Sequence, residues 1–134
     1  MSTTHLMAEP NHHAGQGSFS GVAGLIVAAT MAVGRRHDAD WALELTQPAR
    51  GAAVVDVGCG PGQAARIAAR RGLRVTGVDP SPQMLRMAGW LDRRAGARYL
   101  KGAAEAIPIG DGVAAACWSV ASVHHWTDVG AGVA

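Results

Sequence analysis

The feature that most constrains this chain is the stretch VVDVGCGPG, residues 54–62, in which three glycines follow an apolar, β-branched run. The run favours a buried strand, and residues 63–71 carry the apolar spacing of a helix that ends at Gly72. Glycine weakens strands and helices alike, so glycines between the two indicate a backbone that something must approach closely. Such a turn presents bare N–H groups and the positive end of a helix, which suits an anionic or polar nucleotide group.

The alternation of strand and helix continues along the chain. Apolar runs predict strands at residues 52–57, 73–78, 97–101 and 113–120, and Ser81 followed by Pro82 predicts the start of a further helix. Strands that alternate with helices pair in parallel through right-handed crossovers. The expected fold is therefore α/β, a Rossmann-like parallel sheet with flanking helices, preceded by an N-terminal helical extension with helices at 21–33 and 38–46.

Composition narrows the classes of function. The chain of 134 residues is 49% hydrophobic and 16% charged with a formal net charge of +2, as in globular proteins, and its 4% aromatic content argues against a nucleic-acid surface. The apolar stretch 21–33 is too short to span a membrane. Cys59 and Cys117 form no CxxC pair, which favours a cytoplasmic location, and His12 and His13 lack further ligands at metal-binding spacing, so no metal is expected.

Two widespread nucleotide-binding loops fit these glycines poorly. A phosphate-binding Walker loop ends in Lys-Ser or Lys-Thr, whereas Gln63 and Ala64 follow Gly62. The dinucleotide fingerprint has glycine at its first, third and sixth positions, and counting from Gly58 the sixth position is Gln63. This spacing weakens the hypothesis that the chain is a nicotinamide-dependent oxidoreductase, which stays open as an alternative.

The pattern Asp56-x-Gly58-x-Gly60-x-Gly62 resembles motif I of the class I S-adenosylmethionine-dependent methyltransferases. The resemblance implies that the loop amides, with Cys59 between the glycines, pack against the methionine and ribose parts of S-adenosyl-L-methionine. The stretch VTGVDPSPQML, residues 75–85, is similar to the family's second-strand motif. This similarity implies that Asp79 accepts hydrogen bonds from both ribose hydroxyls and that Pro80 and Ser81 lie beside it. It also implies that Met84 lies near the adenine edge. A plain turn role for Asp79 before proline is the alternative.

Two further stretches complete the resemblance. KGAAEAIPIGDG, residues 101–112, is similar to the segment after the family's third strand, although Ala103 stands where relatives commonly have an acid; it places Ala104 and Glu105 near the adenine, unless Glu105 is a solvated turn residue. WSVASVHHWTDV, residues 118–129, resembles methyltransferases of the ubiquinone and menaquinone type. It implies that Ser119 and Val120 lie under the methionine end and that His124 and His125 lie beside the methyl group.

The resemblance implies a methyltransferase with a small-molecule acceptor. His124 and His125 are candidates for proton removal from an attacking hydroxyl or enol, or they only pack within their loop. Three parts follow along the chain: a flexible tail at 1–18, an N-terminal helical lid at 19–50, and a partial S-adenosylmethionine-binding domain at 51–134.

The family's sheet has the strand order 3-2-1-4-5-7-6, so the C-terminal strands are expected to be missing from this chain. The fourth strand then becomes an edge that can pair with another chain. Activity of the chain as it stands is accordingly doubtful, and a non-catalytic remnant or interaction module that retains the fold is the alternative.

Overall fold

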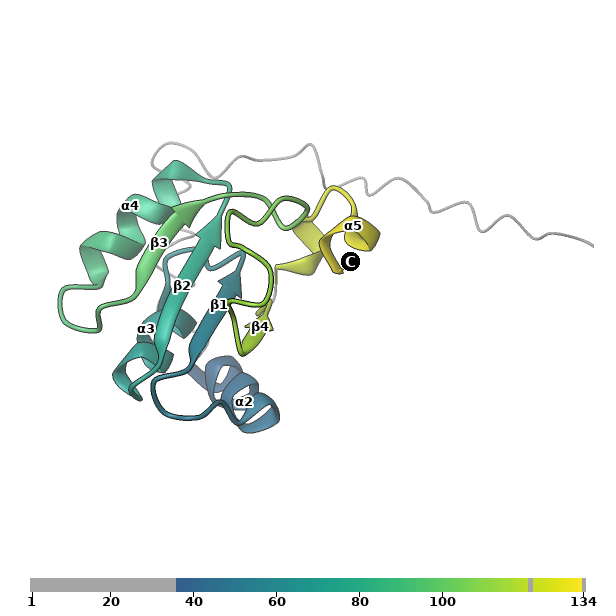
Figure 1. Cartoon of the computed structure of the whole chain (residues 1–134). Helices are drawn as coiled ribbons and strands as arrows, with labels where there is room; N and C mark the ends of the chain where they lie inside the picture. Colours follow the sequence, from purple (N-terminus) through teal and green to yellow (C-terminus); the bar gives the residue numbers. More distant parts are fainter. Residues whose placement is uncertain (1–35, 121, 134) are drawn as a thin grey trace, which may run out of the picture.

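The computed structural model describes residues 36–120 and 122–133, which form one sheet with helices packed against it (Figure 1). In chain order the elements are α2 (Arg36–Thr46), β1 (Ala53–Val57), α3 (Gln63–Arg70), β2 (Arg74–Asp79), α4 (Pro82–Leu91), β3 (Arg98–Lys101), β4 (Ala116–Trp118), the 3-10 helix η1 (Val123–His125) and α5 (Val129–Val133).

The four strands lie in the order β3-β2-β1-β4, and every neighbouring pair is parallel. Strand β1 is central: Val55 pairs with Thr76 of β2 on one side and with Cys117 of β4 on the other. The α/β class and the parallel sheet predicted from the sequence are thereby confirmed. All four strands end at the same edge, because parallel neighbours run in the same direction.

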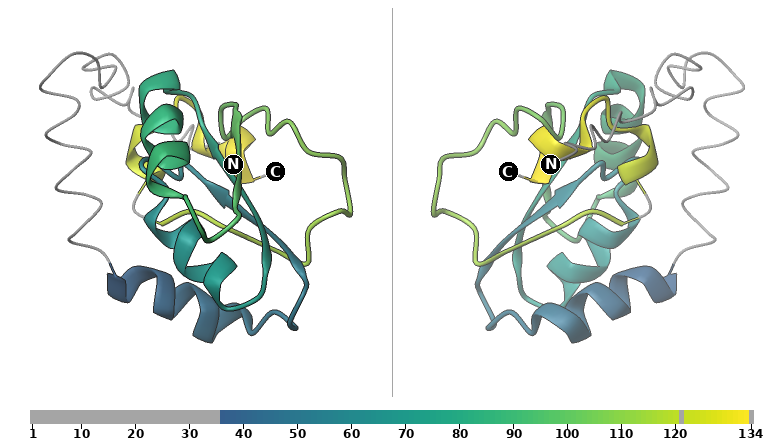
Figure 2. Two further views of the ribbon diagram at one scale, coloured as in Figure 1. Left: turned by 90° about the vertical axis from the view of Figure 1, so that its left-hand side faces the viewer. Right: turned by 90° about the vertical axis from the view of Figure 1, so that its right-hand side faces the viewer.

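Helices α3 and α4 cover one face of the sheet (Figure 2). Side chains alternate along a strand, so Val54 and Asp56 of β1 point to this face, while Val55 and Val57 point to the other. The small side chains of Ala65 and Ala68 are fully buried and let α3 lie close to the strands. The buried core on this face consists of Leu43, Val54, Ala65, Ala68, Leu73, Val75 and Trp118.

The opposite face is covered by the irregular segment 102–115 instead of a helix (Figure 2). Val55, Val57 and Val78 pack there against partly buried Ile107 and Ile109. This second core is smaller than the first, because an irregular segment presents fewer apolar side chains to the sheet than a helix does. Its backbone is held locally, for example by the hydrogen bond from Ile109 N–H to the carbonyl of Ile107 at 2.8 Å.

The start of α4 follows from Ser81 and Pro82, as predicted. Ser81 is the N-cap, and its hydroxyl accepts a hydrogen bond from the N–H of Met84 at 3.3 Å. Pro82 takes the first helical position, where its fixed φ suits a helix and its missing N–H costs nothing. This cap fixes the point at which the chain leaves β2, directly after Asp79.

The fourth strand is shorter than predicted. A strand was expected over residues 113–120, but only Ala116–Trp118 pair with β1, and Val113 is exposed. After Trp118 the chain turns across the end of β1, where the hydroxyl of Ser122 donates to the carbonyl of Val57 at 3.0 Å. That contact draws the chain away from the strand direction. Within the described residues β4 is an edge strand, and its association with another chain stays a prediction.

Helix α2 packs against α3 through Ala39 and Leu43, at the end of the sheet opposite the carboxyl ends of the strands (Figure 1). It therefore does not cover that edge. Residues 19–35 of the predicted lid, including the expected helix at 21–33, lie outside the described residues, as does the predicted tail at 1–18.

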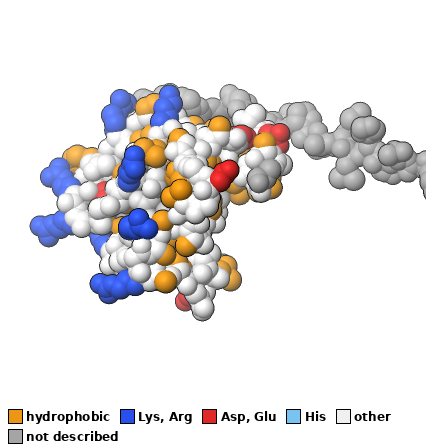
Figure 3. Space-filling view, in the orientation of Figure 1, with side chains coloured by type: hydrophobic (Ala, Val, Ile, Leu, Met, Phe, Trp, Pro, Cys, Tyr) orange, Lys and Arg blue, Asp and Glu red, His pale blue; other side chains and the backbone are white. Residues whose placement is uncertain are grey.

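Lys and Arg side chains gather over the side of the molecule formed by α4 and β3, whereas the acidic side chains in this view lie mostly toward α5 (Figure 3). The arginines of the α4–β3 side largely face solvent; one ion pair, between Arg71 and Asp40, is formed within the described residues. No helix in the described ranges has the length and apolar character needed to cross a membrane.

Candidate functional site

The residues predicted from the sequence to form a site come together at the carboxyl edge of the sheet. Each of the four strands contributes the segment that directly follows it, as parallel pairing requires. The predicted residues lie on or beside these segments, namely Asp56, Gly58, Cys59, Gly60 and Gly62 from β1, Asp79, Pro80, Ser81 and Met84 from β2, Ala104 and Glu105 from β3, and Ser119, Val120, His124 and His125 from β4.

The glycine loop is wound tightly between β1 and α3. Gly58, Gly60 and Gly62 have φ angles of 70°, 51° and 76°, in the left-handed region that other residues adopt only with strain. The N–H groups of Gly58 and Cys59 both donate to the carbonyl of Val78 at 2.7 and 3.0 Å. The loop is thus fastened to β2, and its backbone bends back over the end of the sheet.

Asp79 fastens the same loop from β2. One carboxylate oxygen accepts the N–H of Gly60 at 2.9 Å, and the other accepts the N–H of Ser81 at 2.8 Å. Burial raises the pKa of this carboxyl, while the two hydrogen bonds and the charge of His125 counteract part of that rise. A carboxylate has about four acceptor positions, so two remain for a ligand.

Asp56 is the most deeply buried acid of the site, with 1% of its surface exposed. Burial, and to a lesser extent the charge of Asp79, raise the pKa of Asp56 from 3.8 to about 7, although the N–H of Ala65 in the first turn of α3 donates to it. Its Oδ2 atom has no hydrogen-bond partner. Because most buried polar atoms in folded proteins are paired, an unpaired carboxylate oxygen indicates a place for a donor.

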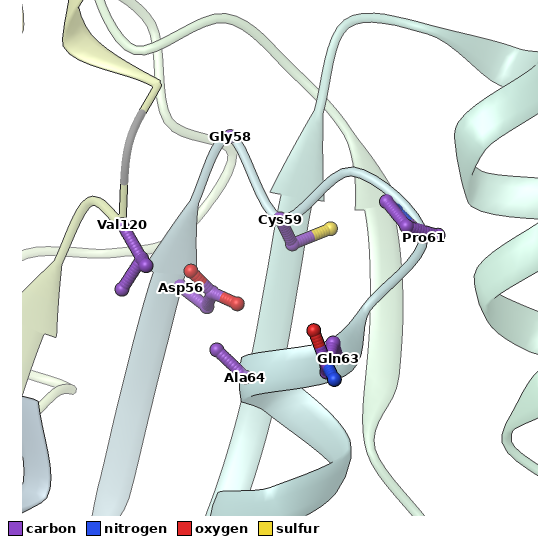
Figure 4. Close-up of a pocket in the computed structure, with 7 residues that line it drawn as sticks. All are labelled: Asp56, Gly58, Cys59, Pro61, Gln63, Ala64 and Val120. Atoms are coloured by element: carbon purple, nitrogen blue, oxygen red, sulfur yellow. The ribbon is translucent and has the colours of Figure 1, made fainter. Parts of the chain in front are cut away.

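A pocket lies beside this unpaired oxygen, beneath the glycine loop (Figure 4). Gln63, the first residue of α3, contributes a second buried acceptor without a partner, its Oε1 atom. The pocket thus combines a buried carboxylate with an amide oxygen, which suits a cationic donor such as an ammonium group. The residues that line the pocket are Asp56, Gly58, Cys59, Pro61, Gln63, Ala64 and Val120.

Two glycines in this region, Gly62 and Gly77, are required because other side chains of this protein occupy the space that a Cβ would need. A Cβ added to Gly62 would lie 2.7 Å from the hydroxyl of Tyr99 in β3, and one added to Gly77 would lie 2.8 Å from the Sγ of Cys59. Cys59 therefore points toward β2, and burial with the nearby acids raises the pKa of its thiol, so it stays protonated.

Tyr99 is held in turn by Asp92, which lies just after α4. The Asp92 carboxylate accepts the tyrosine hydroxyl at 2.9 Å and also accepts the N–H groups of Ala95, Gly96 and Ala97, each at 2.9 Å. Burial is the largest single influence on this carboxyl and raises its pKa, but the four hydrogen bonds together outweigh burial and lower the pKa of Asp92. The loop before β3 thus fixes the ring on which Gly62 rests.

The segment after β4 lies over the end of β1. Val120 lines the pocket, and the hydroxyl of Ser119 is hydrogen-bonded to that of Ser122. His125 is exposed, and its charge counteracts part of the rise in the pKa of Asp79; its expected place beside the methyl group stays a prediction. The backbone of His124 belongs to η1, but its side chain lies outside what the structure describes.

The turn after β3 is tied to the last helix. Ala103 and Ala106 form an isolated bridge, and the methyl group of Ala104 packs against the smaller core. One oxygen of Glu105 accepts the N–H of Asp128 at 2.9 Å, which lowers the pKa of Glu105. Met84 is buried in α4, with 2% of its surface exposed.

Sequence reasoning missed Gln63, Tyr99 and Ser122. Gln63 could have been found, because it is a polar residue directly after the last glycine of the loop and begins the helix beside it. Tyr99 and Ser122 contact glycines from other elements, and no local pattern marks such a pair. Three or more His, Cys, Asp or Glu side chains do not gather into a potential metal site anywhere in the described ranges.

A family model described as a methyltransferase domain matches residues 55–134. Among curated proteins, the chain is 39% identical over 95 residues to a malonyl-[acyl-carrier protein] O-methyltransferase of Salmonella typhimurium, covering 71% of this chain and 37% of the relative. It is 48% identical over 42 residues to a ubiquinone biosynthesis O-methyltransferase of Methylobacterium sp., covering 31% and 17%. The chain therefore spans well under half the length of these relatives.

The fold is also found among solved structures. A protein of Methanococcus maripaludis described as a putative S-adenosyl-L-methionine-dependent methyltransferase superposes with a TM-score of 0.75 at 19% identity, covering 88% of this chain and 57% of that one. At this identity the likeness concerns the fold alone. The match to the methyltransferase-domain model leaves the nicotinamide alternative without support.

Proposed function

Because the chain belongs to the class I S-adenosylmethionine-dependent methyltransferases, we propose that it binds S-adenosyl-L-methionine at the carboxyl edge of its sheet and takes part in methyl transfer to an oxygen atom of an acceptor. The observation that carries the proposal is the pair of unpaired buried acceptors, Asp56 Oδ2 and Gln63 Oε1, in a pocket under the glycine loop. A ligand whose amino-acid end carries an ammonium group supplies the missing donors.

The other predicted residues fit the remaining parts of this cofactor. The two free acceptor positions of Asp79 suit the neighbouring hydroxyls of a ribose. The turn at Ala104 and Glu105 is the place proposed for the adenine, and Ser119 and Val120 that for the methionine end. Because Met84 is buried in α4, its proposed role is to support the adenine side rather than to present an open surface.

When bound, the cofactor supplies a methyl group already activated by a sulfonium. The chain's own task is then to orient the acceptor and exclude water, which accounts for about 7–11 kcal/mol of barrier in favourable cases. His125 is exposed and its charge acts on Asp79; it is proposed to take the proton from an acceptor hydroxyl, with His124 as the neighbouring candidate.

The acceptor is proposed to be a small molecule or an acyl group on a carrier protein. The two curated relatives named above are O-methyltransferases, one acting on a carrier-bound malonyl group according to its name and one belonging to ubiquinone biosynthesis. Their shared feature is an oxygen nucleophile: a hydroxyl acceptor gives its proton to the proposed imidazole base, whereas a malonyl carboxylate is already ionised at neutral pH and needs no base. A cytoplasmic location and association through β4 remain parts of the proposal.

Isothermal titration with S-adenosylmethionine, and separately with NAD⁺, tests the cofactor. We expect saturable binding of the first and none of the second. The Asp79→Ala variant is expected to lose binding, while Asp111→Ala, which alters an exposed acid, binds as the parent does. Urea unfolding of each variant separates lost binding from lost folding. If a folded Asp79→Ala protein binds as well as the parent, the ribose role of Asp79 is wrong.

Transfer is tested with a radiolabelled methyl group and malonyl-loaded acyl carrier protein, with free malonate as the small-molecule arm. Label recovered as an ester supports oxygen transfer. If the cofactor binds while neither acceptor is labelled by this chain, the non-catalytic remnant or interaction module is favoured.

A further inference from the structure

Ser122 occupies the space that a side chain at Gly58 would need. A Cβ placed on Gly58 would overlap with both the Oγ and the Cβ of Ser122, whereas the next nearest atom, Ser122 Cα, lies 3.9 Å away. Ser122 is itself buried, with 8% of its surface exposed. The bare backbone at Gly58 is therefore used by a residue that follows it sixty-four positions later in the chain.

The hydroxyl of Ser122 is fully engaged in hydrogen bonds. It donates its single hydrogen to the carbonyl of Val57 at 3.0 Å. Its remaining partners must then be donors: the indole N–H of Trp126 at 3.3 Å and the hydroxyl of Ser119. One donated and two accepted bonds fix the side chain in a single orientation at the end of β1.

This contact determines where the segment after β4 lies. Ser122 precedes η1 and its carbonyl accepts the N–H of His125 at 2.9 Å. Val120 lines the pocket on one side of Ser122, and His125 acts on Asp79 from the other. A shift of Ser122 would displace both residues relative to the glycine loop.

We infer that Ser122 is a positioning residue, which holds residues 119–120 and 122–126 against the glycine loop, and that Gly58 lacks a side chain in order to admit it. Ser122 acts on the site through Val120 and His125 and not by touching a ligand. The identity of the ligand beside these residues rests on the proposed function, but the contact between Gly58 and Ser122 is measurable without any cofactor.

A double-mutant cycle tests the inference with four proteins: the parent, Gly58→Ala, Ser122→Gly and the double variant. The probe is S-adenosylhomocysteine, titrated by calorimetry, and the urea midpoint is measured in parallel. In the parent background Gly58→Ala introduces both backbone strain and overlap with Ser122, whereas in the Ser122→Gly background only the strain remains. We expect Gly58→Ala to weaken binding at least about tenfold more in the first background than in the second.

A spectroscopic readout separates positioning from a general loss of stability. In Ser122→Ala the urea midpoint should fall, because buried partners of the hydroxyl are left unpaired, while the indole N–H resonance of Trp126 should shift and the amide of His125 should exchange faster relative to the amides of the sheet. Thr127→Ala removes an exposed hydroxyl directly after these residues and should change neither signal. Unchanged signals in Ser122→Ala would contradict the positioning role.

If Gly58→Ala weakens the binding of S-adenosylhomocysteine equally in both backgrounds, the inference is overturned. The missing side chain at Gly58 would then make room for the cofactor and not for Ser122. If Gly58→Ala fails to fold, recovery of folding in the double variant supports the inference, and failure of both variants opposes it. If the parent does not bind S-adenosylhomocysteine, the proposed function fails, while the cycle on the urea midpoint still decides the contact.

Discussion

Replacing Asp56 by asparagine is expected to make the ligand-free protein more stable at neutral pH and less able to bind its cofactor. The carboxylate lies in a buried position beside Asp79, and its Oδ2 atom has no partner. Asparagine has nearly the same shape and carries no charge, so it keeps an acceptor for the N–H of Ala65 while removing the cost of an unpaired buried anion.

The size of the effect follows from the pKa of Asp56, which burial raises from 3.8 to about 7. Between these pH values the folded chain holds a proton that the unfolded chain has released, so the free energy of unfolding falls as the pH rises. By about pH 8 the loss approaches about 4 kcal/mol, taken as an upper value. Asp79, whose pKa burial also raises, contributes in the same direction.

Urea unfolding followed by circular dichroism between about pH 4 and about pH 8 measures this slope. The parent should lose stability across the window, and Asp56→Asn should lose much less, so that the two curves meet near pH 4 and separate near pH 8. Asp111→Asn, at an exposed acid, is the control and should follow the parent. Parallel curves for the parent and Asp56→Asn would refute the reasoning.

The same variant tests the cofactor's ammonium. Loss of a hydrogen bond to a charged group costs about 1.5–3 kcal/mol, which corresponds to binding weaker by about 10-fold to 150-fold. Calorimetry with S-adenosylhomocysteine at about pH 7 measures the difference. A variant that gains stability but binds as tightly as the parent would place the ammonium elsewhere.

Three further outcomes are expected. Gly62→Ala should destabilise the fold more than Gly96→Ala, because both have positive φ but only the first places a Cβ against Tyr99; equal urea midpoints would contradict the contact. Asp92→Ala should lower the free energy of unfolding by about 1–3 kcal/mol, and the parent's advantage should vanish in acid as the pH falls through the lowered pKa of Asp92, which unfolding at about pH 2 would reveal. Glu105→Gln should speed amide exchange of Asp128 while leaving the sheet amides protected, and unchanged exchange would show that the bond at 2.9 Å contributes little.

Much of the fold could be predicted because its signals are local. Ser81 and Pro82 lie side by side and specify the start of α4, and the apolar run before Gly58 specifies β1. Parallel pairing then brings the segment after each strand to one edge, so Asp79 was expected near the loop, and it bonds to the N–H of Gly60. What that carboxylate binds in a ligand stays a prediction.

The remaining features depend on contacts between distant residues. Nothing near Gly58 in the sequence indicates Ser122, and nothing near Gly62 indicates Tyr99. The predicted strand 113–120 was too long at its carboxyl end for a similar reason: the prediction included Ser119 and Val120, but after Trp118 the chain turns to place Ser122 on Val57. The periodicity of apolar residues along the chain cannot show where a tertiary hydrogen bond replaces the pairing of one strand with the next.

The fit between Gly58 and Ser122 has an evolutionary consequence. A larger residue at either position leaves no room for the other, so a mutation at one is tolerated only after a compensating change at its partner. Homologues should therefore inherit the two sites as a matched pair, and transplanting either residue alone between homologues should fail.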